Sequence, residues 1–546
     1  MRISRFLLPL LFLAAACTSN APKAYYWERF EMDGHRTGVA VPAADNAAEA
    51  IGEVSGKAYN APNGKIFRGG RIYGVASLLL DVQPDMAALK EVVAYSPDGL
   101  GKYPPESPLS NFISDHLFEG AERIIGRKVD VALCNFGGIR CEIPAGNVLL
   151  DDIVSMLPFD NYVTWLSVPG SELRKVFVQM GKKLLCVSGA ELVYSDGKLV
   201  SAKIGGKPLD DRRMYGLATI DFLVDGGDGF KLARGAKDMV ISDVRIGDLI
   251  LEDIRAISAA GKDLSYGTDG RVCMNKKAGS DVAKDSPEPV QEAAPAPSGK
   301  PKLVIMHCND THSHFDPFPT GKGMRGGIIE RAAFADSIRH KYPARKVLFL
   351  HAGDFNQGTS YHSHLHGSLE PKMINAMGYD CITLGNHELD NGIEDLADRL
   401  SKISCPIVCA NCEFPDTLQR FVTPYTILKR GGMKIGIIGM ESDIATMVAA
   451  PIAQRIVQHD NAQTLMKWAP YLKEEKGCDM VILLSHLGYD EDQAVIQNAR
   501  CIDLVIGGHT HTFVKDFVFS MDLDGKLVPI ITDGCWGAEM GLVKVY

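Results

Sequence analysis

The chain lacks several features that mark other protein classes. Its 546 residues include 58 Lys plus Arg against 67 Asp plus Glu, so its net charge is −9 and it has no basic excess for gripping nucleic-acid backbones. No apolar run reaches the roughly 20 residues of a membrane-spanning helix, and no internal repeat relates the two halves. The composition, 46% hydrophobic and 23% charged, is that of a folded protein, and the length indicates more than one domain.

Histidine is scarce in the first half of the chain. Of the 15 histidines, 13 lie after Pro301. Histidine is a common metal ligand and the usual acid–base side chain near neutral pH. The second half is therefore the first place to look for a metal site or a proton-transfer site.

Residues 1–17 have the pattern of a secretory signal peptide. Arg2 and Arg5 precede an apolar run, residues 6–16, which ends in three alanines. The following Cys17 resembles the lipid-attachment cysteine of bacterial lipoproteins, which implies an exported protein anchored through lipidated Cys17 in the periplasm or outer membrane. Ordinary cleavage with an incidental Cys17 is the alternative. Export permits disulfides, but the sequence assigns no pairing.

The chain divides once. Residues 276–300 contain no aromatic side chain and are rich in Pro and Ala toward their end, so they cannot bury enough apolar surface to order themselves. They predict a linker. We expect one domain over residues 18–275 and a second over residues 301–546.

The second domain alternates short apolar runs with amphipathic segments. The runs are residues 303–306, 347–350, 381–384, 480–484 and 504–506. Unbroken apolar strands belong to sheets that are covered on both faces, so the pattern predicts a layered α/β domain. A polar motif accompanies each run: HCNDTH, HAGD, GNHELD, SHLG and GGHTH. Open α/β sheets carry their sites at the carboxyl ends of strands, so we expect these motifs to form one site.

In this order the motifs resemble the calcineurin-like metallophosphoesterases, specifically the bacterial 5′-nucleotidases. The resemblance covers residues 302–546 and implies a four-layered α/β sandwich that holds two divalent ions. The implied ligands of one ion are Asp310, His312, Asp354 and His511. Those of the other are Asp354, Asn386, His486 and His509, so that Asp354 is shared.

The implied ligand set suits a hydrolytic metal pair. Imidazole and carboxylate ligands without thiolate favour Zn, Mn, Co or Fe. Two such ions can activate a bridging water and clamp the attacking and leaving oxygens. The resemblance further implies that His387, held by Asp390, faces the phosphoryl group or the leaving oxygen. An acid–base side chain contributes about 10²–10⁴-fold, whereas phosphate monoester hydrolysis requires up to about 10²¹-fold, so the metal pair must contribute most.

Residues 75–272 resemble the α+β nucleotide-binding domain that accompanies this phosphatase in 5′-nucleotidases. The matching stretches are ESPLSNFISDHL, NFGGIRCEIPAG, LPFDNYV and IDFLVDGGDGF. The resemblance implies these roles: phosphate binding by Arg140, base stacking by Phe159 and Phe222, a hydrogen bond to the base from Asn161, and ribose binding by Asp228. For the two phenylalanines alone, core packing is the alternative. The order of the two domains is reversed relative to the family, and residues 18–74 match nothing.

The remaining histidines and clustered cysteines carry weaker signals. His362, His364 and His366 alternate in sequence and could chelate an ion, but a solvated loop is the simpler interpretation. We expect His307, His314 and His351 to lie at most around the ligands. Cys405, Cys409 and Cys412 only faintly resemble a zinc knuckle, because no fourth ligand is near.

Together these features predict an exported two-metal 5′-nucleotidase. Its substrate would be a small nucleotide and not a nucleic-acid polymer. One alternative is a hydrolase of nucleotide diesters or anhydrides, such as 2′,3′-cyclic nucleotides or UDP-sugars. Another is a lipoprotein that binds nucleosides without turnover. The sequence does not indicate the oligomeric state.

Overall fold

The computed structural model describes residues 25–224, 226–275 and 299–546. The predicted signal peptide, Cys17 and almost all of the predicted linker lie outside these residues. Within the described part of the chain, no helix has both the length and the apolar character that a membrane span requires.

Two stacked sheets form the core of the second domain. One sheet has the strand order β1 (Tyr25–Glu31), β31 (Glu539–Val545), β16 (Leu303–Cys308), β19 (Val347–Ala352), β20 (Cys381–Thr383), β21 (Ile407–Val408) and β23 (Val422–Thr423). The other has the order β24 (Tyr425–Arg430), β25 (Met433–Glu441), β27 (Met480–His486), β28 (Leu504–Ile506), β30 (Leu527–Ile531) and β29 (Val518–Met521). Fully buried side chains of both sheets, such as Ile305, Leu350 and Ile482, meet in one cluster between them.

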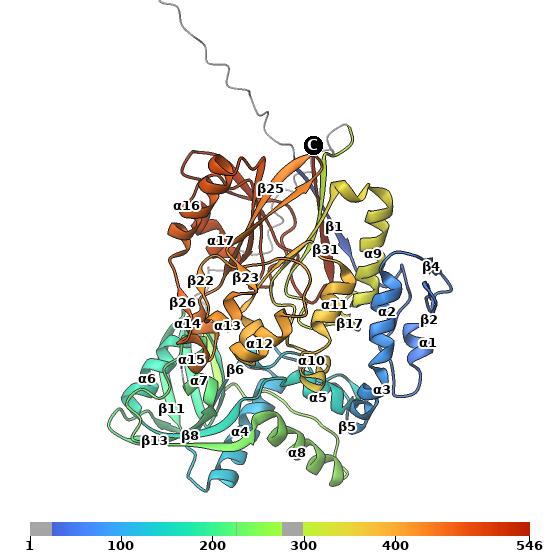
Figure 1. Ribbon diagram of the computed structural model, residues 1–546. Coiled ribbons are helices and arrows are strands. Elements are labelled where there is room, and N and C mark those ends of the chain that lie inside the picture. The colour runs from blue at the N-terminus through green and yellow to red at the C-terminus, as the bar shows by residue number, and fades with distance from the viewer. Residues whose placement is uncertain (1–24, 225, 276–298) are drawn as a thin grey trace, which may run out of the picture.

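Helices cover the outer face of each sheet. Over the first sheet lie α9 (Ile328–Lys341), α11 (Glu370–Met377) and α12 (Ile393–Leu400). Over the second lie α16 (Asn461–Pro470) and α17 (Tyr489–Ile496). The apolar runs of the sequence are thus strands buried on both faces, as their composition requires. The predicted four-layered α/β sandwich is confirmed (Figure 1).

The first described segment packs on this sandwich. Strand β1 pairs antiparallel with β31, from Tyr25 opposite Val545 to Glu31 opposite Glu539. After α1 (Ala47–Ile51) and the small sheet of β2 (Glu53–Ser55), β3 (Ala58–Asn60) and β4 (Ile66–Arg68), helix α2 (Ile72–Asp81) packs against α9 and α11. Asp336 of α9 accepts the backbone N–H of Ile72 at 2.9 Å, which satisfies a free donor at the start of α2.

This packing corrects the expected domain boundary. We expected residues 18–275 to form one unit, but residues 25–90 share the apolar core of residues 301–546. We call these two segments together the phosphoesterase half, after the family that residues 302–546 resemble. The physical reason is that β1 fills a sheet edge made by the last strand of the chain. The two strands lie at opposite ends of the described chain, and nothing in the sequence of either one indicates that they pair.

The other half, residues 91–275, follows as a mixed α+β unit, and we call it the nucleotide-binding half after the role that its resemblance implies. Its main sheet has the order β14 (Asp238–Arg245), β8 (Tyr162–Pro169), β13 (Met214–Ile220), β6 (Val131–Asn135) and β9 (Leu185–Ser188). Helix α4 (Pro108–Ile125) begins at a capping box, in which Ser107 Oγ accepts the N–H of Ser110 at 3.1 Å and Ser110 Oγ accepts that of Ser107 at 2.8 Å. Helices α6 (Gly170–Gln179) and α8 (Ile246–Ala259) also belong to this half.

Smaller elements complete the chain. In the nucleotide-binding half they include α5 (Leu150–Met156), α7 (Asp221–Val224), η2 (Phe136–Gly138), η3 (Gly227–Gly229), the pair β5 (Val92–Ser96) and β7 (Gly146–Leu149), and a sheet of β12 (Lys207–Pro208), β11 (Lys198–Ile204), β10 (Ala190–Ser195) and β15 (Val272–Asn275). In the phosphoesterase half they include α10 (Ser360–Leu365), α14 (Ile444–Met447), α15 (Ala450–Ala453) and η5 (Asn386–Leu389).

The two halves meet below the sandwich as drawn in Figure 1. Helix α5 contacts α10, where the N–H of Ser360 donates to Ser155 Oγ at 2.9 Å. Nearby, Lys90 Nζ lies 2.6 Å from Asp151 Oδ2. These contacts bring the nucleotide-binding half against the loops that follow the phosphoesterase strands.

Candidate functional site

The predicted metal ligands lie at the carboxyl ends of five strands. Asp310 and His312 follow β16, and Asp354 follows β19. Asn386 follows β20 in η5, His486 ends β27, and His509 and His511 follow β28. Both sheets thus contribute ligands to one site, because the parallel strands of the two sheets have their carboxyl ends on the same side of the sandwich.

The ligand atoms form two adjacent groups. Asp310, His312 and His511 make the first, which we call the His312 site, and Asp354, His486 and His509 make the second, the His486 site. Within each group the ligand atoms lie within 4.8 Å of one another. Asp354 Oδ2 is 3.1 Å from His486 Nε2 and 3.6 Å from His312 Nε2, so this carboxylate is within reach of both sites.

The backbone at these ligands is strained. Asp310, His312, Asp354, His509 and His511 all have positive φ, from 45° to 75°, a region that residues other than glycine rarely adopt. Such strain costs of order 1–3 kcal/mol per residue and persists only where surrounding contacts impose it. Gly353 shows how tight these contacts are, since a Cβ there would lie 2.5 Å from His486 Nδ1. Tight packing therefore holds the ligand loops in this strained conformation, and it fixes the positions of the ligand side chains.

The donor chemistry fits divalent cations. His486 Nδ1 is 2.7 Å from the carbonyl of Ala352, and His312 Nδ1 is 3.1 Å from that of Gln357, so each Nδ1 donates its proton to the backbone. Each Nε2 then points into the site: that of His486 lies 3.1 Å from Asp354 Oδ2, and that of His312 lies 2.9 Å from His511 Nε2. Asn386 Oδ1 is also buried without a hydrogen-bond partner among the described residues. Acceptors gathered around one point are what a cation requires.

The electrostatics agree with this interpretation. Burial lowers the pKa of His509 and of His511 to about 3, so both imidazoles are neutral near pH 7, as metal ligands must be. Burial raises the pKa of Asp310 to about 7, and the neighbouring Asp354 adds to this effect. Burial alone would lower the pKa of His486, but Asp354 and Asp310 hold it well above its usual range. The site therefore attracts positive charge.

The structure brings together His387 and Asp390, the pair expected to handle protons. His387 Nδ1 lies 2.7 Å from Asp390 Oδ2, and the backbone N–H of His387 donates to Asp354 Oδ1 at 3.0 Å. Burial works to lower the pKa of His387, but Asp390 and Asp354 outweigh it and raise that pKa. The His387 ring lies 5.2 Å from that of His312 and lines the same cavity as the two sites.

Arg140 reaches the metal ligands from the nucleotide-binding half. It follows η2, and its Nη2 lies 3.2 Å from His312 Nε2. Burial lowers its pKa, opposed by the charges of Asp354 and Asp390. A guanidinium here can bind two oxygens of a phosphate at once.

The other predicted substrate residues line the same cavity, which has a volume of about 980 Å³. Phe159 stacks on His387, with ring centroids 5.6 Å apart and planes at 29°, and Arg140 lies 5.9 Å from its ring. Phe222 and Asn161 lie on the cavity wall. Asp228 is held by Asn135 Nδ2 at 2.8 Å and Lys183 Nζ at 2.9 Å.

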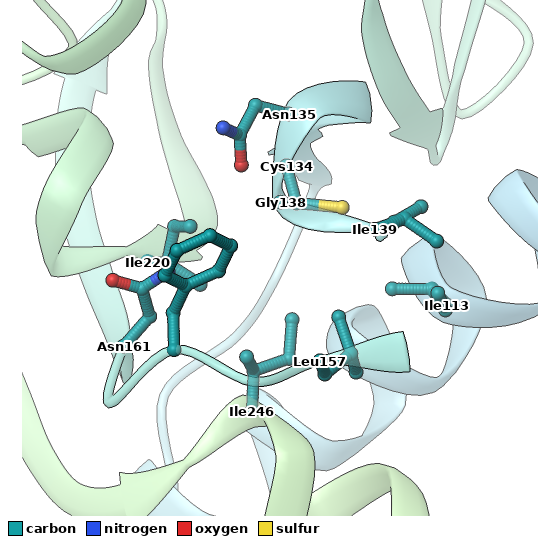
Figure 2. Close-up of a pocket in the computed structure, with 10 residues that line it drawn as sticks. Ile113, Cys134, Asn135, Gly138, Ile139, Leu157, Asn161, Ile220 and Ile246 are labelled. Carbon is teal, nitrogen blue, oxygen red and sulfur yellow. The ribbon is translucent and has the colours of Figure 1, made fainter. Parts of the chain in front are cut away.

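A small apolar pocket adjoins this cavity (Figure 2). Ile113, Ile139, Leu157, Ile220 and Ile246 surround it, and the side chains of Asn135 and Asn161 add polar groups. Both asparagines also line the large cavity. The nucleotide-binding half therefore adds apolar surface with a few polar groups beside the large cavity.

The loop histidines correct one expectation. His364 and His366 are exposed, but His362 is 2% exposed, and His362 and His364 both lie in helix α10 instead of a loop. Its Nδ1 is 3.0 Å from Glu370 Oε1, and its Nε2 is 3.3 Å from Asn391 Nδ2. Neighbouring turns of the fold bury this ring, which the alternating sequence pattern could not indicate.

Two buried carboxylates near the ligands were missed from sequence. Glu388 accepts the backbone N–H groups of Asp354 at 2.9 Å, Asn356 at 3.0 Å and Gly385 at 2.6 Å, so it fixes two ligand loops. Glu441 ends β25 and is 1% exposed; burial raises its pKa to about 7. Glu388 follows His387 in the GNHE motif and could have been found from it, whereas nothing local marks Glu441.

Each half of the chain matches a known protein family. Residues 92–234 match the 5′-nucleotidase C-terminal domain, and residues 303–513 match the calcineurin-like phosphoesterases. The chain contains both domains. The domain named for the C-terminal part of 5′-nucleotidases precedes the phosphoesterase domain here.

The relatives found by sequence include several 5′-nucleotidases. A snake venom 5′-nucleotidase of Gloydius brevicauda is 32% identical over 273 residues, 45% of this chain and 46% of that protein. A probable 5′-nucleotidase of Treponema pallidum is 33% identical over 227 residues, 40% of this chain and 38% of that protein. The chain thus spans less than half the length of either relative. The solved 5′-nucleotidase precursor of Thermus thermophilus is 27% identical, with a TM-score of 0.41 over 45% of this chain and 52% of that one.

Proposed function

We propose that this protein is an exported 5′-nucleotidase, which hydrolyses nucleoside 5′-monophosphates to nucleoside and phosphate. The observation that carries the proposal is that the two ligand groups share one cavity with Arg140 and Phe159, from the other half of the chain. The candidate metal ligands and an aromatic ring that could stack on a nucleobase thus face the same cavity. The 5′-nucleotidase relatives support the same substrate class.

The residues present fit two divalent ions. Asp310, His312 and His511 would hold one and His486, His509 and Asn386 the other, with Asp354 shared. Zn, Mn, Co and Fe all suit this nitrogen and oxygen set. Ions held there would polarise the phosphoryl oxygens and make water acidic enough to attack near neutral pH.

The side chains of the chain supply orientation and proton handling. Arg140 would hold the phosphate against the ligands, and His387, oriented by Asp390, would face the leaving 5′-oxygen. Phe159 and Phe222 would stack on the base, while Asn161 and Asp228 would bind base and ribose. Stacking accepts any base because every base has a π face, so a broad base preference is expected.

A second candidate reaction follows from the size of the cavity. About 980 Å³ lies at the upper end of the range of ligand pockets, roughly 300–1,000 Å³, and leaves room beside a monophosphate for a larger leaving group. Hydrolysis of nucleotide diesters or anhydrides would use the same ligands. A nucleoside-binding lipoprotein without turnover would leave the His387–Asp390 pair without a role.

The test is a substrate panel on the metal-loaded protein. AMP, cyclic AMP and UDP-glucose are compared by product release, before and after chelation and after Mn²⁺ or Zn²⁺ is restored. We expect AMP to be the best substrate and chelation to abolish turnover reversibly. Faster release from UDP-glucose would favour the anhydride reaction, and adenosine binding without turnover of any substrate would refute both.

The proposal places the protein at the cell envelope through lipidated Cys17. Its support is the order of Arg2, Arg5, an apolar run and Cys17. Mass spectrometry of the mature N-terminus tests this. A diacylglyceryl group on Cys17, absent after Cys17→Ser, is expected, and an unmodified N-terminus elsewhere would refute anchoring.

A further inference from the structure

A sixth strand of the phosphoesterase half also ends in a side chain able to interact with metal. Strand β25 runs parallel to β27, and its last residue, Glu441, is the register partner of His486. In a sheet, register partners on adjacent strands present their side chains to the same face. Glu441 therefore lies beside His486 on the side from which His486 reaches Asp354.

The carboxylate of Glu441 is buried and only half satisfied. Its Oε1 accepts the N–H of Ser442 at 2.7 Å and the Ser442 hydroxyl at 2.8 Å. Its Oε2 is buried and has no hydrogen-bond partner among the described residues. A buried carboxylate oxygen left in this state is costly unless a positive charge lies near it.

The backbone of Glu441 is fixed in place. Asn411 Oδ1 accepts its N–H at 2.9 Å, and Asn411 Nδ2 donates to its carbonyl at 2.7 Å. Gln458 Nε2 donates to the same carbonyl at 3.3 Å. The side chain of Glu441 therefore starts from a fixed point of the backbone beside His486.

The charge that Glu441 faces belongs to the His486 site. His486 interacts electrostatically with Glu441 as well as with Asp354 and Asp310. Two divalent ions would bring four positive charges to a centre whose own ligands include only two carboxylates, Asp310 and Asp354. Glu441 does not line the cavity, so it faces the ligands from behind and not from the substrate side.

We propose that Glu441 is a positioning residue of the metal centre: its carboxylate supplies counter-charge behind His486 and strengthens the binding of a divalent cation at the His486 site. The inference rests on the proposed two-metal centre. Groups that lie around metal ligands typically change metal affinity about 10–100-fold when removed. The His312 site, which lacks this neighbour, depends on it less.

The test is metal titration of Glu441→Gln, which keeps the shape of the side chain and removes its charge. Mn²⁺ or Zn²⁺ binding to the metal-free protein is followed by calorimetry, with metal content after dialysis as a second readout. We expect two ions per chain in the natural protein. In the variant, one ion binds as before and the other binds about 10–100-fold more weakly. Excess metal should restore turnover of AMP.

Two further variants make the outcome specific. Glu330→Gln is the control, because it also replaces a buried glutamate with glutamine. Glu330 is 2% exposed and does not line the cavity, so this variant should bind both ions normally. Glu441→Asp keeps the charge and should bind the second ion more tightly than Glu441→Gln, even if the latter folds poorly. Equal affinity of Glu441→Gln and the natural protein for both ions would overturn the inference. A natural protein that binds fewer than two ions would instead overturn the proposed metal centre.

Discussion

The metal side and the nucleotide side of the cavity are built in different ways. On the metal side, each ligand ends or follows a strand, and five of the seven have a strained backbone with positive φ. Buried contacts such as those of Glu388 hold the ligand loops in place. On the nucleotide side, Phe159, Phe222 and Asp228 come from a loop, a short helix and a 3₁₀ turn. Arg140 and Phe159 contact His312 and His387 of the metal side.

This difference has a physical consequence. Ligand positions on the metal side are set within one domain by strand register, which is costly to disturb. Positions on the nucleotide side relative to the metal depend on how the halves meet, through contacts such as Ser155 with Ser360 and Lys90 with Asp151. Changes on the metal side should therefore abolish chemistry, and changes on the nucleotide side should weaken substrate binding.

The largest effect is expected for Asp354→Asn. The variant loses the negative charge that lies within reach of both sites, at 3.1 Å from His486 and 3.6 Å from His312. Turnover of AMP should fall by more than the about 10⁴-fold that loss of an acid–base group can cost. Asp380→Asn, which changes a carboxylate at the opposite end of β20, should retain activity. Near-normal turnover by Asp354→Asn would contradict the shared-ligand role.

A smaller loss is expected for His387→Asn. The ring lies beside the ligands and is oriented by Asp390 at 2.7 Å, so its removal should lower kcat about 10²–10⁴-fold while both ions still bind. Asp390→Asn keeps the ring and should cost less. Steady-state kinetics together with metal content measure this, and a loss of metal in His387→Asn would show that the residue acts on the metal centre instead.

Packing of the N-terminal segment on the metal side predicts a stability effect. Met32 is fully buried in the core of the phosphoesterase half, and Met32→Ala should lower the free energy of unfolding by about 2–5 kcal/mol. Denaturant unfolding should show this loss in the transition that added Mn²⁺ shifts. Met239→Ala, at a side chain 49% exposed on β14, should have little effect. A loss confined to a transition insensitive to Mn²⁺ would place Met32 in the other half.

The smallest effect is expected on the nucleotide side. Phe159→Ala should remove about 1–3 kcal/mol of stacking, which corresponds to a roughly 5–150-fold rise in KM for AMP. A substrate without a base, such as ribose 5-phosphate, provides the control, and its KM should change far less. Equal changes for both substrates would mean that Phe159 acts through His387, on which it stacks, and not on the base.

Sequence patterns indicated which side chains of the metal side come together, because the signals of that side are local. Each ligand lies within a few residues of an apolar run, so strand and motif could be identified together, and the structure brings Asp310, His312 and His511 within 4.8 Å of one another. The nucleotide side was predicted only through its resemblance to a known domain. Its residues line the cavity, while their contacts with a bound nucleotide remain a prediction.

Other features had no local signal. The burial of His362 depends on Glu370 and Asn391, and the union of β1 with β31 joins the two ends of the described chain. Glu441 is distinguished only by its register opposite His486, 45 residues later in the chain. In each case the deciding contact joins two segments, and the sequence of neither segment indicates that they pair.

The sequence by itself determined which side chains can bind metal and where each lies relative to its own strand, because alternating apolar runs and polar motifs act over a few residues. The tertiary structure decided which of them meet: Arg140 with His312, β1 with the last strand, and Glu441 with His486. Those contacts depend on sheet register and on the docking of one half against the other, which are properties of the whole packed chain.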